Sequence, residues 1–165
     1  MALDFFEAKC QLPPTDQTLF GICDDPNGGR AFLNLEENEQ HRWGATVKNE
    51  LRHPVVFTAV DKCVLNDHDL PGYGRCDAML TTSNHLYLIE LKNQRKGWTQ
   101  DAVTQLETTI RLLKEHHDIS SFKRKKAFAC NKKHPQFTCI DNEENLSFFR
   151  KTGFRLDIHA EIVII

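Results

Sequence analysis

Residues 74–94, which read GRCDAMLTTSNHLYLIELKNQ, constrain the fold of this chain most. Two mostly apolar runs lie on either side of a short polar stretch, and this pattern predicts a β-hairpin. Three charged residues, Asp77, Glu90 and Lys92, interrupt the apolar runs. Charged side chains are seldom buried without a partner, so these three residues are the first candidates for a functional site.

The expected register of this hairpin brings the three charges together. If the turn centres on Ser83 and Asn84, an antiparallel pairing sets Asp77 nearly opposite Glu90. The Cβ atoms of cross-strand neighbours lie ~4.5–5.5 Å apart, and two carboxylates that close repel each other unless a proton or a cation lies between them. Residues two apart share a strand face, so Lys92 projects beside Glu90. Two carboxylates with a divalent cation and a lysine outline a site for phosphodiester hydrolysis.

The remaining sequence predicts a mixed α/β domain in which helices flank one sheet. Its 165 residues suit a single domain with a sizeable core. Apolar periodicity and turn-forming residues define the expected elements. They are a hairpin over 18–34, a helix over 36–51, a strand over 55–65, the hairpin over 74–94, a helix over 101–117, a strand over 125–130, a helix over 142–153 and a strand over 155–165.

Composition predicts a cytoplasmic protein that does not enter the membrane. No apolar stretch approaches the ~20 residues of a membrane helix, and the amino terminus lacks the basic-then-apolar layout of a secretion signal. The scattered cysteines are expected to be reduced thiols in or near the core. A zinc site of Cys130, His134 and Cys139 is an alternative, although it lacks a fourth ligand and paired spacing. The six cysteines are Cys10, Cys23, Cys63, Cys76, Cys130 and Cys139.

Asp77, twelve intervening residues and then Glu90-Leu91-Lys92 resemble the signature of the PD-(D/E)XK nuclease superfamily. The expected element order over 36–131 is also similar to the α-β-β-β-α-β core of that superfamily. Cys76 stands where the signature has proline, at a position that varies among its members. The resemblance implies a restriction-endonuclease-like fold, in which a mixed central sheet is flanked by helices and carries an added N-terminal β-hairpin.

This resemblance divides the single domain into a hairpin extension (1–34), a core (35–131) and a C-terminal helix and strand (132–165). It also implies roles for particular residues. Asp77 and Glu90 would hold Mg²⁺ or Mn²⁺, and Lys92 would assist the attacking water.

Two further positions follow from the resemblance. Many members carry an acid on the helix before the sheet, for which Glu50 is the preferred candidate here and Glu39 the alternative. Gln105 matches a glutamine of RecB-like members, although the tyrosine expected five residues later is Ile110.

The implied function is metal-dependent hydrolysis of nucleic acid, with DNA favoured over RNA, in prokaryotic defence or repair. The alternative is an inactive module of the same fold for nucleic-acid binding or complex assembly. Little sequence remains for a DNA-reading domain, so targeting is expected to come from a homodimer or a partner subunit. Basic residues near the site are expected to hold the phosphate backbone. They are Arg95, Lys96, Lys123, Arg124, Lys125 and Lys126.

Overall fold

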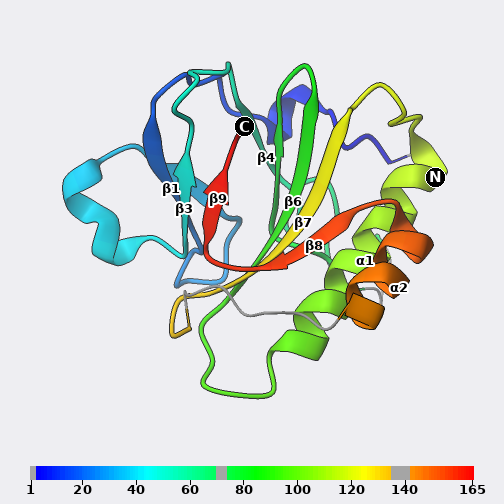
Figure 1. The fold of residues 1–165 in the computed structure, drawn as a ribbon. Helices are drawn as coiled ribbons and strands as arrows, with labels where there is room; N and C mark the ends of the chain where they lie inside the picture. Colours follow the sequence, from blue (N-terminus) through cyan, green and yellow to red (C-terminus); the bar gives the residue numbers. More distant parts are fainter. Residues whose placement is uncertain (1–2, 70–73, 135–141) are drawn as a thin grey trace.

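The computed structural model describes residues 3–69, 74–134 and 142–165. These residues form two mixed β-sheets, with two α-helices on the outer side of the larger sheet (Figure 1). The α/β class predicted from the sequence is therefore confirmed, although the chain builds two sheets instead of one. None of the described helices has the length and apolarity that a membrane crossing needs.

The larger sheet has the strand order β4-β5-β6-β7-β8. Its first three strands are antiparallel, whereas β6, β7 and β8 run parallel. Parallel neighbours need a crossover connection, and α1 and α2 lie in the two crossovers. The bounds are β4 (Val56–Ala59), β5 (Ala78–Thr81), β6 (His85–Lys92), α1 (Thr99–His116), β7 (Arg124–Asn131), α2 (Asn142–Thr152) and β8 (Arg155–Ile158).

The smaller sheet has the order β2-β1-β3-β9, with β9 parallel to β3. The predicted N-terminal hairpin is confirmed as the antiparallel pair β1–β2, but it belongs to this sheet and is not an isolated addition. The bounds are β1 (Leu19–Cys23), β2 (Phe32–Asn34), β3 (Ala45–Lys48) and β9 (Glu161–Val163), with short 3-10 helices η1 (Ala8–Cys10) and η2 (Glu37–Arg42).

One continuous apolar core contains side chains from both sheets and from α1. Two contacts of β6 illustrate how closely the sheets approach. The Tyr87 hydroxyl donates a hydrogen bond to the carbonyl of Val163 at 3.5 Å. A Cβ atom on Gly44 would lie 3.3 Å from a methyl carbon of Leu91. The strand that carries Glu90 is therefore held against the smaller sheet.

The helix predicted over 36–51 is wrong. Only η2 is helical there, and the chain after it forms β3. Burial alternates along residues 45–49, as a strand requires, and the supposed helical stripe residue Leu51 is exposed. Trp43 is buried because its ring packs over Gly21 of β1. The spacing of four between Trp43 and Val47 therefore does not mark a helix face. Trp43 is buried against Gly21, and Val47 is buried as an inward-facing residue of β3.

The strand predicted over 155–165 is also corrected. It breaks at residues 159–160 into β8 and β9, which belong to different sheets. The hydrophobic alternation continues across the break, because Ile158, Ala160 and Ile162 are all buried. The last segment of the chain consequently provides an edge strand to each sheet (Figure 1).

The expectation of six reduced thiols is wrong for one pair, because a disulfide joins Cys10 to Cys63. The remaining described cysteines, Cys23, Cys76 and Cys130, are free and buried, as expected. Cys139, a member of the alternative zinc trio, lies outside the described residues. Disulfides are rare in reducing compartments, so this bond does not favour the cytoplasmic location, which stays a prediction.

We expect Gly21→Ala to lower the free energy of unfolding by about 1–3 kcal/mol, because the new Cβ overlaps the Trp43 ring and forces repacking. That Cβ would lie 2.1 Å from two ring carbons of Trp43. Urea unfolding followed by circular dichroism measures the change. Gly44→Ala is the matched control, since its Cβ would lie 3.3 Å from a flexible methyl group of Leu91 and 3.4 Å from the carbonyl oxygen of Ile22, with no overlap. Equal losses in both variants would contradict the packing of Trp43 over Gly21.

Candidate functional site

The β5–β6 hairpin brings Asp77 and Glu90 together in the predicted register. Ala78 pairs with Ile89, which leaves Asp77 opposite Glu90. Two backbone contacts hold Asp77 there. Its own N–H donates to the carbonyl of Ile89 at 3.0 Å, and the N–H of Leu91 donates to its Oδ2 at 2.7 Å. The two carboxyl groups are hydrogen-bonded to each other. The geometric prediction that they share a face is therefore confirmed.

A shared proton stabilises this pair of acids. Burial raises the pKa of Asp77 to about 6, and the N–H of Leu91 opposes the rise. Burial also raises the pKa of Glu90 well above its usual range, and the neighbouring Asp77 adds to this effect. Glu90 is only 3% exposed, and its Oε1 atom is buried without a hydrogen-bond donor. The pair is thus an acidic site with one unsatisfied oxygen, in which burial favours protonation of the two carboxyl groups.

Lys92 completes the predicted trio. Its Nζ lies 3.3 Å from Oε2 of Glu90, and both side chains are largely buried. The ammonium group lowers the pKa of Glu90, against the stronger effect of burial. Lys92 also borders a surface pocket, so one end of the acidic pair faces a space that a ligand could enter.

Two further acids act on this pair, and neither was found from the sequence. Asp24 follows β1 and Asp61 follows β4, and the charge of each raises the pKa of Asp77. Burial raises the pKa of both. No group of three or more His, Cys, Asp or Glu side chains in the described part of the chain is arranged to hold a metal ion. Asp24 lies in a DDPNGG run that reads as a turn, so no sequence signal distinguished it.

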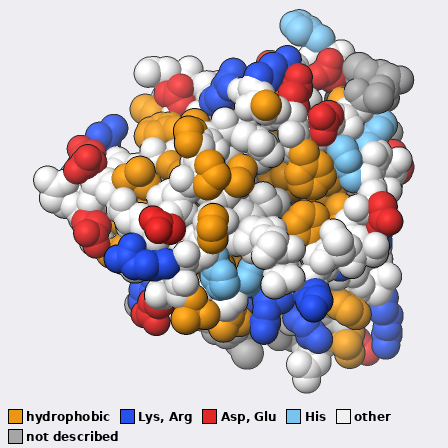
Figure 2. Space-filling model, turned by 90° about the horizontal axis from the view of Figure 1, so that it is seen from above, with side chains coloured by type: hydrophobic (Ala, Val, Ile, Leu, Met, Phe, Trp, Pro, Cys, Tyr) orange, Lys and Arg blue, Asp and Glu red, His pale blue; other side chains and the backbone are white. Residues whose placement is uncertain are grey.

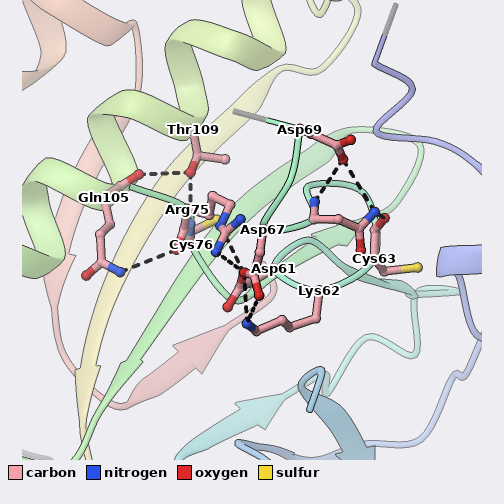
Figure 3. A network of polar contacts seen from close by, with 10 residues as sticks. Asp61, Lys62, Cys63, Asp67, Asp69, Arg75, Cys76, Gln105 and Thr109 are labelled. Carbon is pink, nitrogen blue, oxygen red and sulfur yellow. Dashed lines mark hydrogen bonds and ion pairs between the residues drawn. The ribbon is translucent and has the colours of Figure 1, made fainter. Parts of the chain in front are cut away.

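The segment that leads into Asp77 is fixed on one side by the loop after β4 (Figure 3). The guanidinium of Arg75 contacts Asp61 at 3.0 Å and Asp67 at 2.7 Å. Lys62 donates to both oxygens of Asp67 at 2.9 Å. This network is joined to η1 by the Cys10–Cys63 disulfide. The position of Asp77 therefore depends on residues well outside the hairpin.

Helix α1 holds the same segment from its other side (Figure 3). The N–H of Cys76 donates to the Thr109 hydroxyl at 2.9 Å. Gln105, predicted to be catalytic, donates from Nε2 to the carbonyl of Arg75 at 3.4 Å. Its described contacts are thus with the backbone before Asp77 and not with the carboxyl pair. This geometry is that of a positioning residue.

The structure separates Glu50 from the site. Gly44, just before β3, borders the same pocket as Lys92, and β3 then leads away to Glu50, which is exposed in a turn. Its selection as the helix acid fails because the helix does not exist. Glu39 lies nearer, in η2, but it accepts a hydrogen bond from Asn34 at 3.1 Å and pairs with Arg42 at 3.0 Å.

The predicted basic residues lie at two different ends of the larger sheet. Arg95 and Lys96 are exposed in the loop after β6, on the side of Lys92. The run Lys123–Lys126 begins β7, whose parallel pairing sets Arg124 beside His85. At ~3.3 Å per residue, that end is about 20 Å from Lys92. Figure 2 views the molecule from the end at which β6 and β7 begin, and Lys and Arg side chains gather along part of the edge of this face. The run therefore lies away from the acidic pair.

No family model, curated protein or solved structure was found to match this chain. Its chemistry must accordingly be argued from the geometry. Mg²⁺ commonly binds through one or two carboxylates, with waters and phosphate oxygens as its other ligands. Asp77 and the unsatisfied Glu90 fit this requirement, because a cation in place of the shared proton would satisfy both charges.

We expect Asp77→Asn to stabilise the metal-free protein at pH 8 by up to about 3 kcal/mol, since each pKa unit corresponds to ~1.4 kcal/mol. The pKa of Asp77 is raised to about 6 in the folded state. Its contribution to stability is therefore present below pH ~4 and lost as the pH rises through 6. The gain from the neutral amide should shrink towards pH 4. Urea unfolding at pH 4, 6 and 8 in EDTA measures it.

Asp67→Asn is the control with the opposite sign. Hydrogen bonds from Lys62 and Arg75 lower the pKa of Asp67, so its replacement should lower stability at pH 8. Two results would show that the enclosed charge of Asp77 is not what destabilises the protein. One is a gain in the stability of Asp77→Asn that does not depend on pH, and the other is a gain in the stability of both variants.

Proposed function

We propose that this chain is a metal-dependent nuclease that hydrolyses phosphodiester bonds, with DNA as the favoured substrate. One observation carries the proposal. Two carboxyl groups, one of them with a buried oxygen that lacks a donor, lie against each other beside the Lys92 ammonium group. Such a pair is costly to bury in a purely structural role, because two apolar residues would pack there without repulsion.

Each residue of the trio has a distinct task in this reaction. Asp77 and Glu90 bind Mg²⁺ or Mn²⁺, and the bound ion supplies charge neutralisation at the phosphate and a more acidic water. The pair must release its shared proton first, so metal binding and proton release are coupled. Lys92 orients the attacking water and offsets negative charge on the phosphate. Arg75 and Gln105 keep Asp77 in place through the contacts before β5.

The order of elements supports a restriction-endonuclease-like core as part of this proposal. Strands β4, β5 and β6, then α1 and β7, follow the β-β-β-α-β part of the order implied by the resemblance. The preceding helix is replaced by β3, which belongs to the second sheet. A homodimer or a partner subunit would then supply targeting, since the described residues are taken up by the two sheets and their helices.

The alternative, an inactive module that binds nucleic acid, is favoured by the enclosure of the pair. Glu90 is almost fully buried, and the Lys92 ammonium group is paired to it. The two functions differ in one measurable respect. An enzyme loses its activity when Lys92 is replaced. A binding module shows a salt-sensitive affinity for nucleic acid and no turnover.

We expect Lys92→Ala to lower the rate of Mg²⁺- or Mn²⁺-dependent cleavage by about 100-fold or more, because a positioned proton-transfer group contributes that much. Gel assays on single-stranded, duplex and branched DNA, and on RNA, measure the rate. Lys151→Ala is the matched control, because Lys151 is exposed on α2, and this variant should cleave like the wild type. Equal inactivity of the wild type and Lys92→Ala on every substrate would favour the binding module.

Metal affinity should depend on pH with a defined sign. Below about pH 6, Asp77 is protonated in the metal-free protein, so Mn²⁺ must displace a proton. Because Glu90 must also release a proton, we expect the Mn²⁺ affinity to rise by more than tenfold per pH unit between pH 5 and 6 and less steeply above pH 7, where Asp77 is already ionised. Titration calorimetry at several pH values measures this, with Asp77→Asn as the control. A flat profile would contradict metal binding at Asp77.

A further inference from the structure

A pocket of about 300 Å³ opens where the two sheets meet, and Lys92 is the member of the predicted trio that lines it. The hairpin β1–β2 and the residues just before β3 form one wall. The ends of β6 and β7 form the other wall. The N-terminal hairpin, which the resemblance treats as an addition, thus provides half of the space next to Lys92.

Cations predominate among the charged groups of this pocket. Arg42, Lys92 and Lys132 line it, against the single acid Asp24. The backbone N–H of Lys132 donates to the carbonyl of Lys92 at 2.9 Å, which keeps the two lysines side by side at neighbouring strand ends. The salt bridge of Arg42 to Glu39 is largely exposed and therefore weak, so this guanidinium is available to a ligand.

Apart from the amide of Asn93, the rest of the lining is uncharged and mostly apolar, and it includes an aromatic ring. Pro26 and Phe32 come from the hairpin, and Leu91 comes from β6. Convergent cations beside a small apolar surface suit a ligand that has a phosphate and a flat ring. A volume of about 300 Å³ suits one nucleotide. A base inside a duplex has both faces stacked on its neighbours, so only an unpaired base can lie against Phe32.

We propose that this pocket binds one unpaired nucleotide of the substrate, with its phosphate between Lys92, Lys132 and Arg42 and its base against Phe32. The inference rests on the proposed function and deepens it. It assigns the site a single-stranded or frayed nucleic-acid end as substrate, because a base stacked within a duplex cannot lie against Phe32. Phe32 becomes the residue that selects an unpaired base, and Lys132, beside Lys92, becomes a residue that holds its phosphate.

The test is binding in EDTA, where metal-dependent cleavage does not occur. Fluorescence anisotropy compares a labelled hexadeoxythymidylate with a blunt hairpin duplex of equal charge, at low salt. We expect the single strand to bind at least fivefold more tightly. Lys132→Ala and Phe32→Ala should each weaken single-strand binding by about fivefold or more. Lys133→Ala is the matched control, since this exposed neighbour does not line the pocket, and its effect should stay below twofold.

Competition separates a nucleotide site from a simple anion site. Thymidine monophosphate should displace the hexamer from the wild type at a concentration at least tenfold below that of inorganic phosphate. Equal competition by the two, equal binding of strand and duplex, or equal effects of Lys132→Ala and Lys133→Ala would each overturn the inference. Thermal melting of each variant confirms that it is folded.

A parallel cleavage assay with Mg²⁺ distinguishes this inference from the proposed function. Cleavage by the wild type with no special role of Lys132 or Phe32 in binding would retain the nuclease and refute the nucleotide pocket. Selective single-strand binding that depends on Lys132 and Phe32, without cleavage by the wild type, would retain the pocket and refute the nuclease.

Discussion

The pairing of β5 with β6 is the constraint on which the rest of the molecule depends. A short turn fixes the register, in which Ala78 faces Ile89. That register alone decides that Asp77 meets Glu90, because a slip by one residue would send one of the two carboxyls to the opposite face. The surrounding elements then hold this hairpin. Helix α1 and the loop after β4 fix the approach to Asp77, and the smaller sheet packs against β6.

Placing two acids on a buried hairpin costs stability, and the molecule offsets the cost locally. A shared proton removes one negative charge, the N–H of Leu91 binds Asp77, and Lys92 contacts Glu90. None of these contacts satisfies Oε1 of Glu90. The arrangement is therefore stable enough to fold and still has unfilled capacity for a ligand. Binding sites often contain polar atoms without a hydrogen-bond partner on side chains that the surrounding structure holds rigidly.

The sequence was informative wherever one local rule determined the outcome. The turn after β5 predicted the Asp77–Glu90 register, and apolar periodicity located α1. It failed where tertiary contacts decide, since Trp43 is buried by Gly21 of a distant strand and the Cys10–Cys63 bond spans 53 residues. The position of Lys123–Lys126 could have been deduced, because a strand that follows a crossover helix starts at the far end of the sheet from where its parallel neighbour ends.

The C-terminal segment has a consequence for how this chain can vary. β8 and β9 are edge strands of different sheets, and only residues 159–160 separate them. An insertion or deletion at this junction would shift β9 relative to β8, so at least one sheet would lose its alternation of buried and exposed residues. Loops elsewhere tolerate changes of length far better. The spacing between Ile158 and Ile162 should thus be as strictly maintained as the identity of Asp77 or Glu90.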